Sequence, residues 1–113
     1  MFSSYKIYSS KGEDITGLPV KERDKVSIEY EYLPGNKADF MKVFSYFRKP
    51  CSCTSPIVVD KGGKCIIKVP FSIGNFPYHL RRKEIWVLSK NFTVVMKDGG
   101  NYLLEFSLKV NRK

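Results

Sequence analysis

Three cysteines and one histidine are the side chains of this 113-residue sequence best suited to nucleophilic or metal chemistry. Cys51 and Cys53 are two residues apart, Cys65 follows after eleven intervening residues, and His79 after thirteen more. A thiolate beside an imidazole could act as a nucleophile, and the four side chains together could hold zinc. The spacing lacks the two-residue knuckle of structural zinc sites, and an odd number of cysteines cannot pair completely. We therefore predict reduced, partly buried thiols, with one disulfide as the alternative, and no metal or cofactor.

Carboxylates and glycines offer no stronger catalytic pattern. The acidic residues form three close pairs, but these fall among lysines and turn residues or on the polar face of a predicted strand. Gly62-Gly63 and Gly99-Gly100 fit hairpin turns better than a phosphate-binding loop. His79 stands in a predicted loop, away from the predicted strands that carry the cysteines. We predict that the protein is not an enzyme. The acidic pairs are Glu13-Asp14, Glu22 with Asp24, and Glu29 with Glu31.

Aromatic and basic side chains occur together between positions 76 and 83, which also contain the only compact basic run. Protein interfaces combine tyrosine and arginine in this way. A shorter basic pair follows a predicted strand end at positions 48 and 49. The chain has a net charge of +9, but most of its basic residues are lysines spread over predicted strand faces and turns. The candidate partner-binding residues are Phe76, Tyr78, His79, Arg81, Arg82, Lys83, Arg48 and Lys49.

This segment has three interpretations. It could dock on a protein partner, and we predict this role. It could instead bind nucleic acid, with aromatic rings stacking on bases and basic groups contacting phosphates. In the third interpretation Phe76 and Tyr78 only cap the end of the hydrophobic core. The shortage of arginine and the absence of an RNA-binding motif make nucleic acid the second choice.

Period-two patterning predicts the elements that would position these residues. Residues 25–32 read KVSIEYEY, with apolar side chains on one face, and residues 64–71 alternate in the same way. Residues 56–60 and 83–89 predict two further short strands. Residues 92–97 and 102–110 flank Asp98-Gly99-Gly100-Asn101, which predicts an antiparallel hairpin. Residues 39–47 are apolar on both faces and predict a central strand.

The number and spacing of these segments predict the fold class. Residues near Tyr5 and Ile7, and from Ile15 to Val20, offer one or two weaker strands, and no segment shows helical spacing over three turns. Pro70 suggests that its strand has an edge position or a bulge. About seven antiparallel strands in one domain over residues 1–113 describe an all-β sandwich. Without helices, a Rossmann or P-loop architecture is excluded.

The segment Cys51-Ser52-Cys53-Thr54-Ser55-Pro56 resembles a bacterial family of immunoglobulin-like domains of unknown function, common in Bacteroidetes and related to the ASH, hydin and major-sperm-protein modules. The similarity extends over about residues 25–110, through the turn after Tyr30, the strand at Lys83 to Ser89 and the closing strand at Tyr102 to Val110. It implies an immunoglobulin-like sandwich with its core at about residues 25–110. It also implies a binding or scaffolding module rather than an enzyme.

The cellular setting is an expectation from hydropathy. No apolar run reaches the ~18–20 residues of a membrane span, and the N-terminus lacks the apolar stretch of a secretory signal. We expect a protein that stays in the cytoplasm or in a virion. A small basic all-β protein would suit an accessory or decoration protein of a phage capsid or another large assembly, bound to coat subunits.

Overall fold

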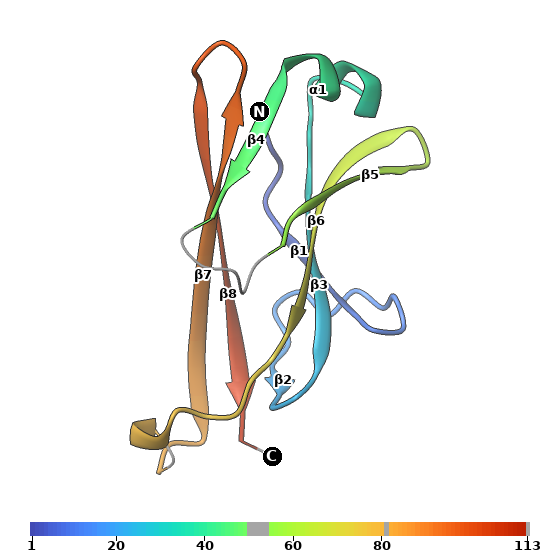
Figure 1. The fold of residues 1–113 in the computed structure, drawn as a ribbon. Coiled ribbons are helices and arrows are strands. Elements are labelled where there is room, and N and C mark those ends of the chain that lie inside the picture. Colours follow the sequence, from blue (N-terminus) through green and yellow to red (C-terminus); the bar gives the residue numbers. More distant parts are fainter. Residues whose placement is uncertain (50–54, 81, 113) are drawn as a thin grey trace.

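Two four-stranded sheets pack face to face in the computed structural model, which describes residues 1–49, 55–80 and 82–112 (Figure 1). The first sheet has the order β1-β3-β6-β5 and the second the order β2-β8-β7-β4. A short helix, α1 (Lys37–Val43), and a single 3-10 turn, η1 (Tyr78–Leu80), complete the described elements. The strands are β1 (Lys6–Ser9), β2 (Val20–Lys21), β3 (Lys25–Glu31), β4 (Phe44–Arg48), β5 (Ile57–Lys61), β6 (Lys64–Ser72), β7 (Ile85–Met96) and β8 (Asn101–Asn111).

The strand order is that of an immunoglobulin-like sandwich, in which strands A, B, E and D form one sheet and strands C, F and G the other. Here β1, β3, β6 and β5 correspond to the first set, and β4, β7 and β8 to the second. The predicted all-β sandwich is therefore confirmed. The described residues form eight strands rather than about seven, because the two-residue β2 adds a partner to β8. This pair is parallel, with Val20 opposite Val110 and Lys21 opposite Asn111, whereas every other strand pairing is antiparallel.

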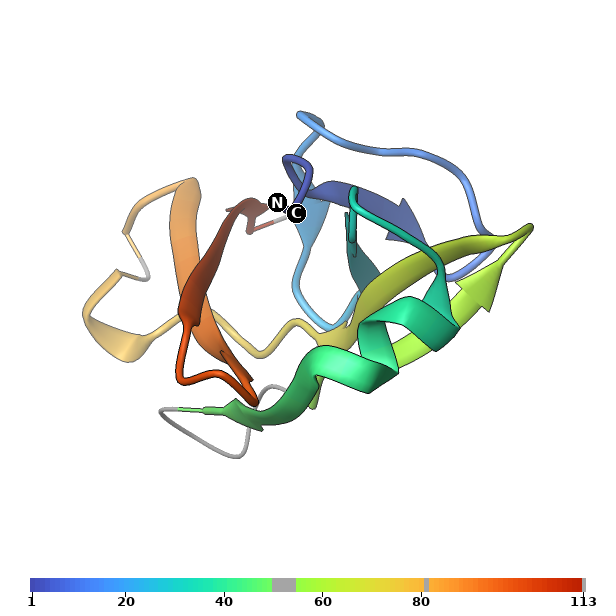
Figure 2. The same ribbon diagram turned by 90° about the horizontal axis from the view of Figure 1, so that it is seen from above.

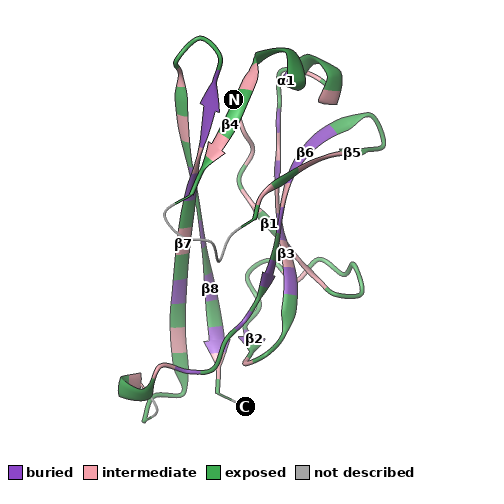
Figure 3. Ribbon diagram, in the orientation of Figure 1, coloured by how far each residue is buried: buried purple, intermediate pink, exposed green. Residues whose placement is uncertain are grey.

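The core lies between the sheets and follows the predicted alternation. Figure 3 shows buried and exposed positions alternating along β8, as expected of a strand with one face toward the core. Aromatic rings join the layers: Tyr30 lies 5.8 Å from Phe92, and Phe71 lies 5.8 Å from Phe106, measured between ring centroids. The fully buried side chains of both sheets include Ile28, Ile67, Val69, Phe92, Phe106 and Leu108.

The predicted central strand at residues 39–47 is wrong in its first half. Residues 37–43 form α1, and β4 begins at Phe44 at the edge of its sheet. The helix starts with a capping box: the side chain of Asn36 accepts the N–H of Asp39 at 2.9 Å, and Asp39 accepts the N–H of Asn36 at 3.2 Å. Its one buried residue, Phe40, stacks on Phe44 at 4.9 Å. In Figure 2, seen from above, α1 crosses from the first sheet to the second.

The strands predicted at residues 83–89 and 92–97 are one continuous strand, β7, which pairs with β8 from Ile85 to Val95. Gly99 completes the hairpin turn with φ of 91°, a conformation that favours glycine. Pro70 lies where β6 pairs only with β3, because the pairing with β5 ends at Lys68. A proline is tolerated at such a local edge.

Two tyrosine hydroxyls cover part of the side of β8 that faces away from β7. Tyr30 donates to the carbonyl of Glu105 at 2.8 Å. Tyr5 donates to the carbonyl of Ser107 at 3.3 Å and accepts the N–H of the same residue at 3.3 Å. Backbone groups at the edge of a sheet attract other strands. At Glu105 and Ser107 they are instead bonded within the chain.

Candidate functional site

The predicted aromatic and basic segment forms the connection from β6 to β7 at one end of the sandwich. Backbone hydrogen bonds give it a defined shape, because Leu80 N–H donates to Pro77 at 2.9 Å and Lys83 N–H donates to Leu80 at 2.9 Å. At its base, the N–H of Ile73 donates to Asp24 at 2.8 Å. The segment is therefore joined by hydrogen bonds to the turn that precedes β3.

Phe76 anchors this connection in the core. Its side chain is 5% exposed, and its ring lies 5.9 Å from that of Trp86 at an interplanar angle of 64°. Its N–H donates to the carboxylate of Glu22 at 3.2 Å. Phe76 thus matches the core-capping interpretation, and its place among the candidate partner-binding residues is corrected: a buried ring is not exposed to a partner.

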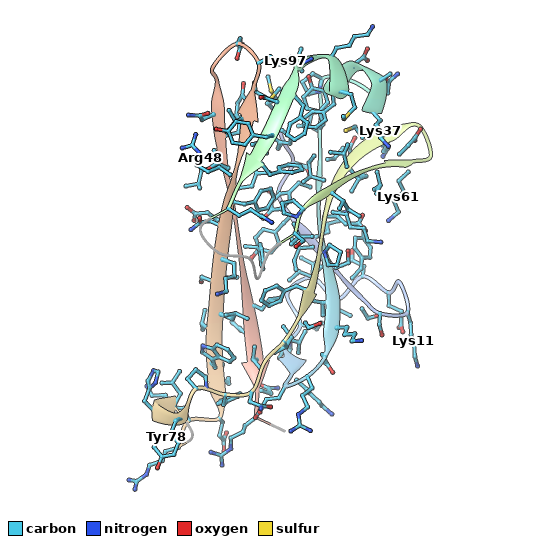
Figure 4. The ribbon with its side chains drawn as sticks, in the orientation of Figure 1. Lys11, Lys37, Arg48, Lys61, Tyr78 and Lys97 are labelled. Carbon is cyan, nitrogen blue, oxygen red and sulfur yellow. The ribbon has the colours of Figure 1, made fainter. Side chains whose placement is uncertain are left out.

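Tyr78 does not share that burial. Its side chain is 87% exposed on η1, and Figure 4 shows it projecting at the end of the molecule. His79, Arg82 and Lys83 are also exposed. Arg81 lies outside the described residues. The structure therefore divides the predicted segment into a buried anchor, Phe76, and an exposed aromatic and basic surface carried by η1 and the residues after it.

Two further arginines lie at the same end, and no sequence prediction included them. Arg23 and Arg112 line a shallow pocket of about 260 Å³ together with Glu22, Asn75 and Phe76. Arg23 has a φ of 69°, uncommon for a residue other than glycine, and its Nε donates to the side-chain oxygen of Asn75 at 3.3 Å. These residues are far apart in the chain, so only the strand order brings them together. We call Tyr78, His79, Arg82, Lys83, Arg23 and Arg112 the arginine end.

Arg48 and Lys49 form a separate position. Both are exposed at the end of β4, where Arg48 pairs with Thr93 in the middle of the sheet rather than at its end. Eight residues of β7 separate Thr93 from Ile85, which is roughly 26 Å along the strand. Figure 4 accordingly shows Arg48 well apart from Tyr78. One compact site cannot include both groups.

The lysines on the outer face of the first sheet are partly neutralised. Lys61 lies 3.1 Å from the carboxylate of Glu29 and 4.6 Å from the ring centroid of Tyr8, and Lys64 lies 4.0 Å from Glu31. Ion pairs at an exposed surface contribute little stability, but they reduce the field that a polyanion would meet. This face is therefore a weaker anion site than its lysine content suggests.

The thiol and imidazole groups are not brought together within the described residues. Cys65 is fully buried near the start of β6, and burial raises the pKa of its thiol. His79 lies beyond the other end of that strand, so the two cannot form a dyad. Cys51 and Cys53 lie outside the described residues, so the state predicted for their thiols stays a prediction. In the described part of the chain no cluster of three or more histidine, cysteine or acidic side chains could hold a metal ion.

Comparison with known proteins adds no relatives: no protein-family model, curated protein or solved structure matches this chain. None of the helices in the described ranges is long and apolar enough to span a membrane. The arginine end is therefore the candidate functional site.

Proposed function

We propose that the protein is a non-enzymatic docking module that binds an acidic surface of a protein partner through the arginine end. The observation that carries this proposal is the exposed side chain of Tyr78, on a connection that Phe76 anchors in the core at the same end of the sandwich as Arg23 and Arg112. Tyrosine and arginine dominate the binding energy of protein interfaces. Loops held by a rigid scaffold are the usual position for such residues.

The acidic character of the partner follows from charge. Arg23, Arg82 and Arg112 carry guanidinium groups, which bind carboxylates through paired hydrogen bonds. Glu22 is the acidic residue in the same pocket, but its carboxylate accepts the backbone N–H of Phe76. A positive surface with one of its few carboxylates engaged internally is complementary to a negative one.

The test is affinity capture with matched variants. Protein carrying both Tyr78→Ala and Arg82→Glu should capture at least about tenfold less partner, because the exposed aromatic ring is removed and a positive charge becomes negative. Lys97→Glu is the matched control, since Lys97 is exposed at the opposite end of the hairpin and its loss changes the net charge equally. Equal capture by both variants, with unchanged melting temperatures, would contradict the proposal.

Nucleic acid is the second candidate, because the exposed ring of Tyr78 lies at the same end as three described arginines. Stacking and phosphate contacts need such a combination. Fluorescence anisotropy with a single-stranded oligonucleotide separates the two candidates. With about four phosphate contacts, from Arg23, Arg82, Lys83 and Arg112, binding to a single strand should weaken by roughly fiftyfold between about 50 and 200 mM salt. Weak binding that hardly changes with salt would exclude this candidate.

A further inference from the structure

β7 is longer than β4, the strand that pairs with it on the side away from β8. β8 pairs with β7 from Ile85 to Val95, whereas β4 pairs with it only from Thr93 to Met96. Among the described residues, no strand pairs with the β4 side of β7 before Thr93. Figures 1 and 2 place η1 beside the start of β7 on the side away from β8. Within the described part of the chain, the first half of β7 therefore has no strand partner on this side, and η1 lies beside it only at its start (Figure 1). We call this side of β7, from Ile85 to Thr93, the open edge.

Backbone groups along this edge point toward the open side. Met96 N–H donates to Gly100 at 2.8 Å in the hairpin, and Lys97 N–H donates to Val43 at 2.8 Å on the opposite side. Successive residues of an antiparallel strand alternate between its two neighbours, so even-numbered residues of β7 bond to β8 and odd-numbered residues face the other way. The residues that face the open side in the first half of β7 are Ile85, Val87 and Ser89.

The side chains at this edge suit strand pairing. Ile85 is 51% exposed and Val87 is 59% exposed, although both are large and apolar. Branched side chains of this kind pack well against the side chains of a neighbouring strand. A strand paired with β7 would cover part of both side chains, whereas in the chain alone they face solvent.

Positive charge lies at both ends of the open edge. Arg48 and Lys49 are exposed beside its β4 end. Arg82, Lys83 and Glu84 are exposed before Ile85, and these three side chains leave a net positive charge at that end. This charge distribution favours a segment with acidic residues at its ends. A second copy of this chain would bring like charges together, which disfavours it as the occupant.

We propose that an extended segment of the protein partner, with acidic residues at both ends, adds to the edge of β7 as a further strand. Backbone hydrogen bonds to Ile85, Val87 and Ser89 would hold it, as in other cases of strand addition. The inference rests on the proposed docking function and specifies the form of the partner. The ~26 Å along β7 from Ile85 to Thr93 corresponds to about eight or nine extended residues.

A synthetic peptide of that length is the probe: acetyl-Glu-Glu-Val-Thr-Val-Thr-Val-Glu-Glu-amide, which reads similarly in either strand direction. A peptide with proline at the central valine and at the threonine that follows it is its control, because one of these two neighbouring N–H groups must face β7 and proline lacks an N–H. The first peptide should bind, and the proline peptide should bind at least about tenfold more weakly. Equal binding of both peptides would overturn strand addition.

The variant Val87→Pro tests strand addition by a change in the protein instead of in the peptide. It removes an N–H that faces the open side and leaves the bonds to β8 intact, so folding is retained while peptide binding falls at least about tenfold. Leu103→Pro is the matched control: Leu103 is 57% exposed on β8, and its odd number places its N–H away from β7. This variant should bind the peptide as the unmodified protein does. Equal loss in both variants would overturn the assignment to β7.

Amide hydrogen exchange gives a readout that needs no variant. In the free protein the amides of Val87 and Ser89 should exchange rapidly, and that of Leu88 slowly, because only Leu88 bonds to β8. The peptide should slow exchange at Val87 and Ser89. Slow exchange at Val87 in the free protein, or no change with peptide at about 1 mM, would overturn the proposal.

Partner capture by these variants separates strand addition from the docking function on which this inference rests. If Val87→Pro captures the partner as well as the unmodified protein while Tyr78→Ala with Arg82→Glu does not, docking stands and strand addition is wrong. If capture is unaffected by either change, both are wrong.

Discussion

Replacing Phe76 by alanine should separate the core role of this residue from a role in binding. The ring is 5% exposed and contacts Trp86, so its removal leaves a cavity at the end of the core. Truncating a buried phenylalanine costs about 3–5 kcal/mol of unfolding free energy. Tyr78→Ala is the matched control, because an 87% exposed ring two residues away should change stability by less than about 0.5 kcal/mol.

Urea denaturation followed by the fluorescence of Trp86, the only tryptophan, measures both variants. With an m-value of about 1.5 kcal/mol/M, a loss of about 3 kcal/mol lowers the midpoint by about 2 M. Phe76→Ala should also shift the native emission of Trp86 to longer wavelength, because water reaches the indole. Equal midpoints for Phe76→Ala and Tyr78→Ala would refute the assignment of Phe76 to the core.

Two further predictions concern buried groups. Burial raises the pKa of Tyr30, so the folded state keeps the proton more tightly, and the stability this gives is full below about pH 10 and declines at higher pH. Tyr30→Phe should flatten that decline in unfolding free energy, measured by urea titrations between about pH 9 and 11; an unchanged slope would contradict this. At neutral pH the same change should cost about 1–2 kcal/mol of unfolding free energy, because the Glu105 carbonyl loses its donor. In protein carrying Cys51→Ser and Cys53→Ser, iodoacetamide should label Cys65 roughly a thousandfold more slowly than in urea, because the thiol is fully buried. Comparable labelling rates would show that Cys65 is accessible.

Most of the sheet could be predicted because period-two alternation directly reports a strand with one buried face. β3, β6 and β8 follow their predicted boundaries closely, whereas β7 joins two strands that the sequence predicts separately. The prediction of a strand at α1 is wrong because residues 39–47 are apolar at both parities, which is typical of a central strand, while Phe40, Phe44 and Phe47 also fit a helical spacing. The capping box at Asn36 and Asp39 was the available signal for a helix start.

The candidate site was only partly predictable, since its members come from separate parts of the chain. The run from Tyr78 to Lys83 is local and could be found from residue types alone. Arg23 and Arg112 join it only through the order of the strands, which no short pattern encodes. The burial of Phe76 also depends on Trp86, ten residues further along the chain.

The tyrosine hydroxyls on β8 make the two edges of the second sheet unequal. Tyr5 and Tyr30 occupy backbone groups at Ser107 and Glu105, and β2 pairs with the end of the same strand. Endless fibres require a subunit that can accept a strand on one edge and offer another. A sheet with one blocked edge can add a strand only at its other edge. The second sheet therefore disfavours a strand on its β8 side, so a ladder that begins at β7 would not continue across this sheet.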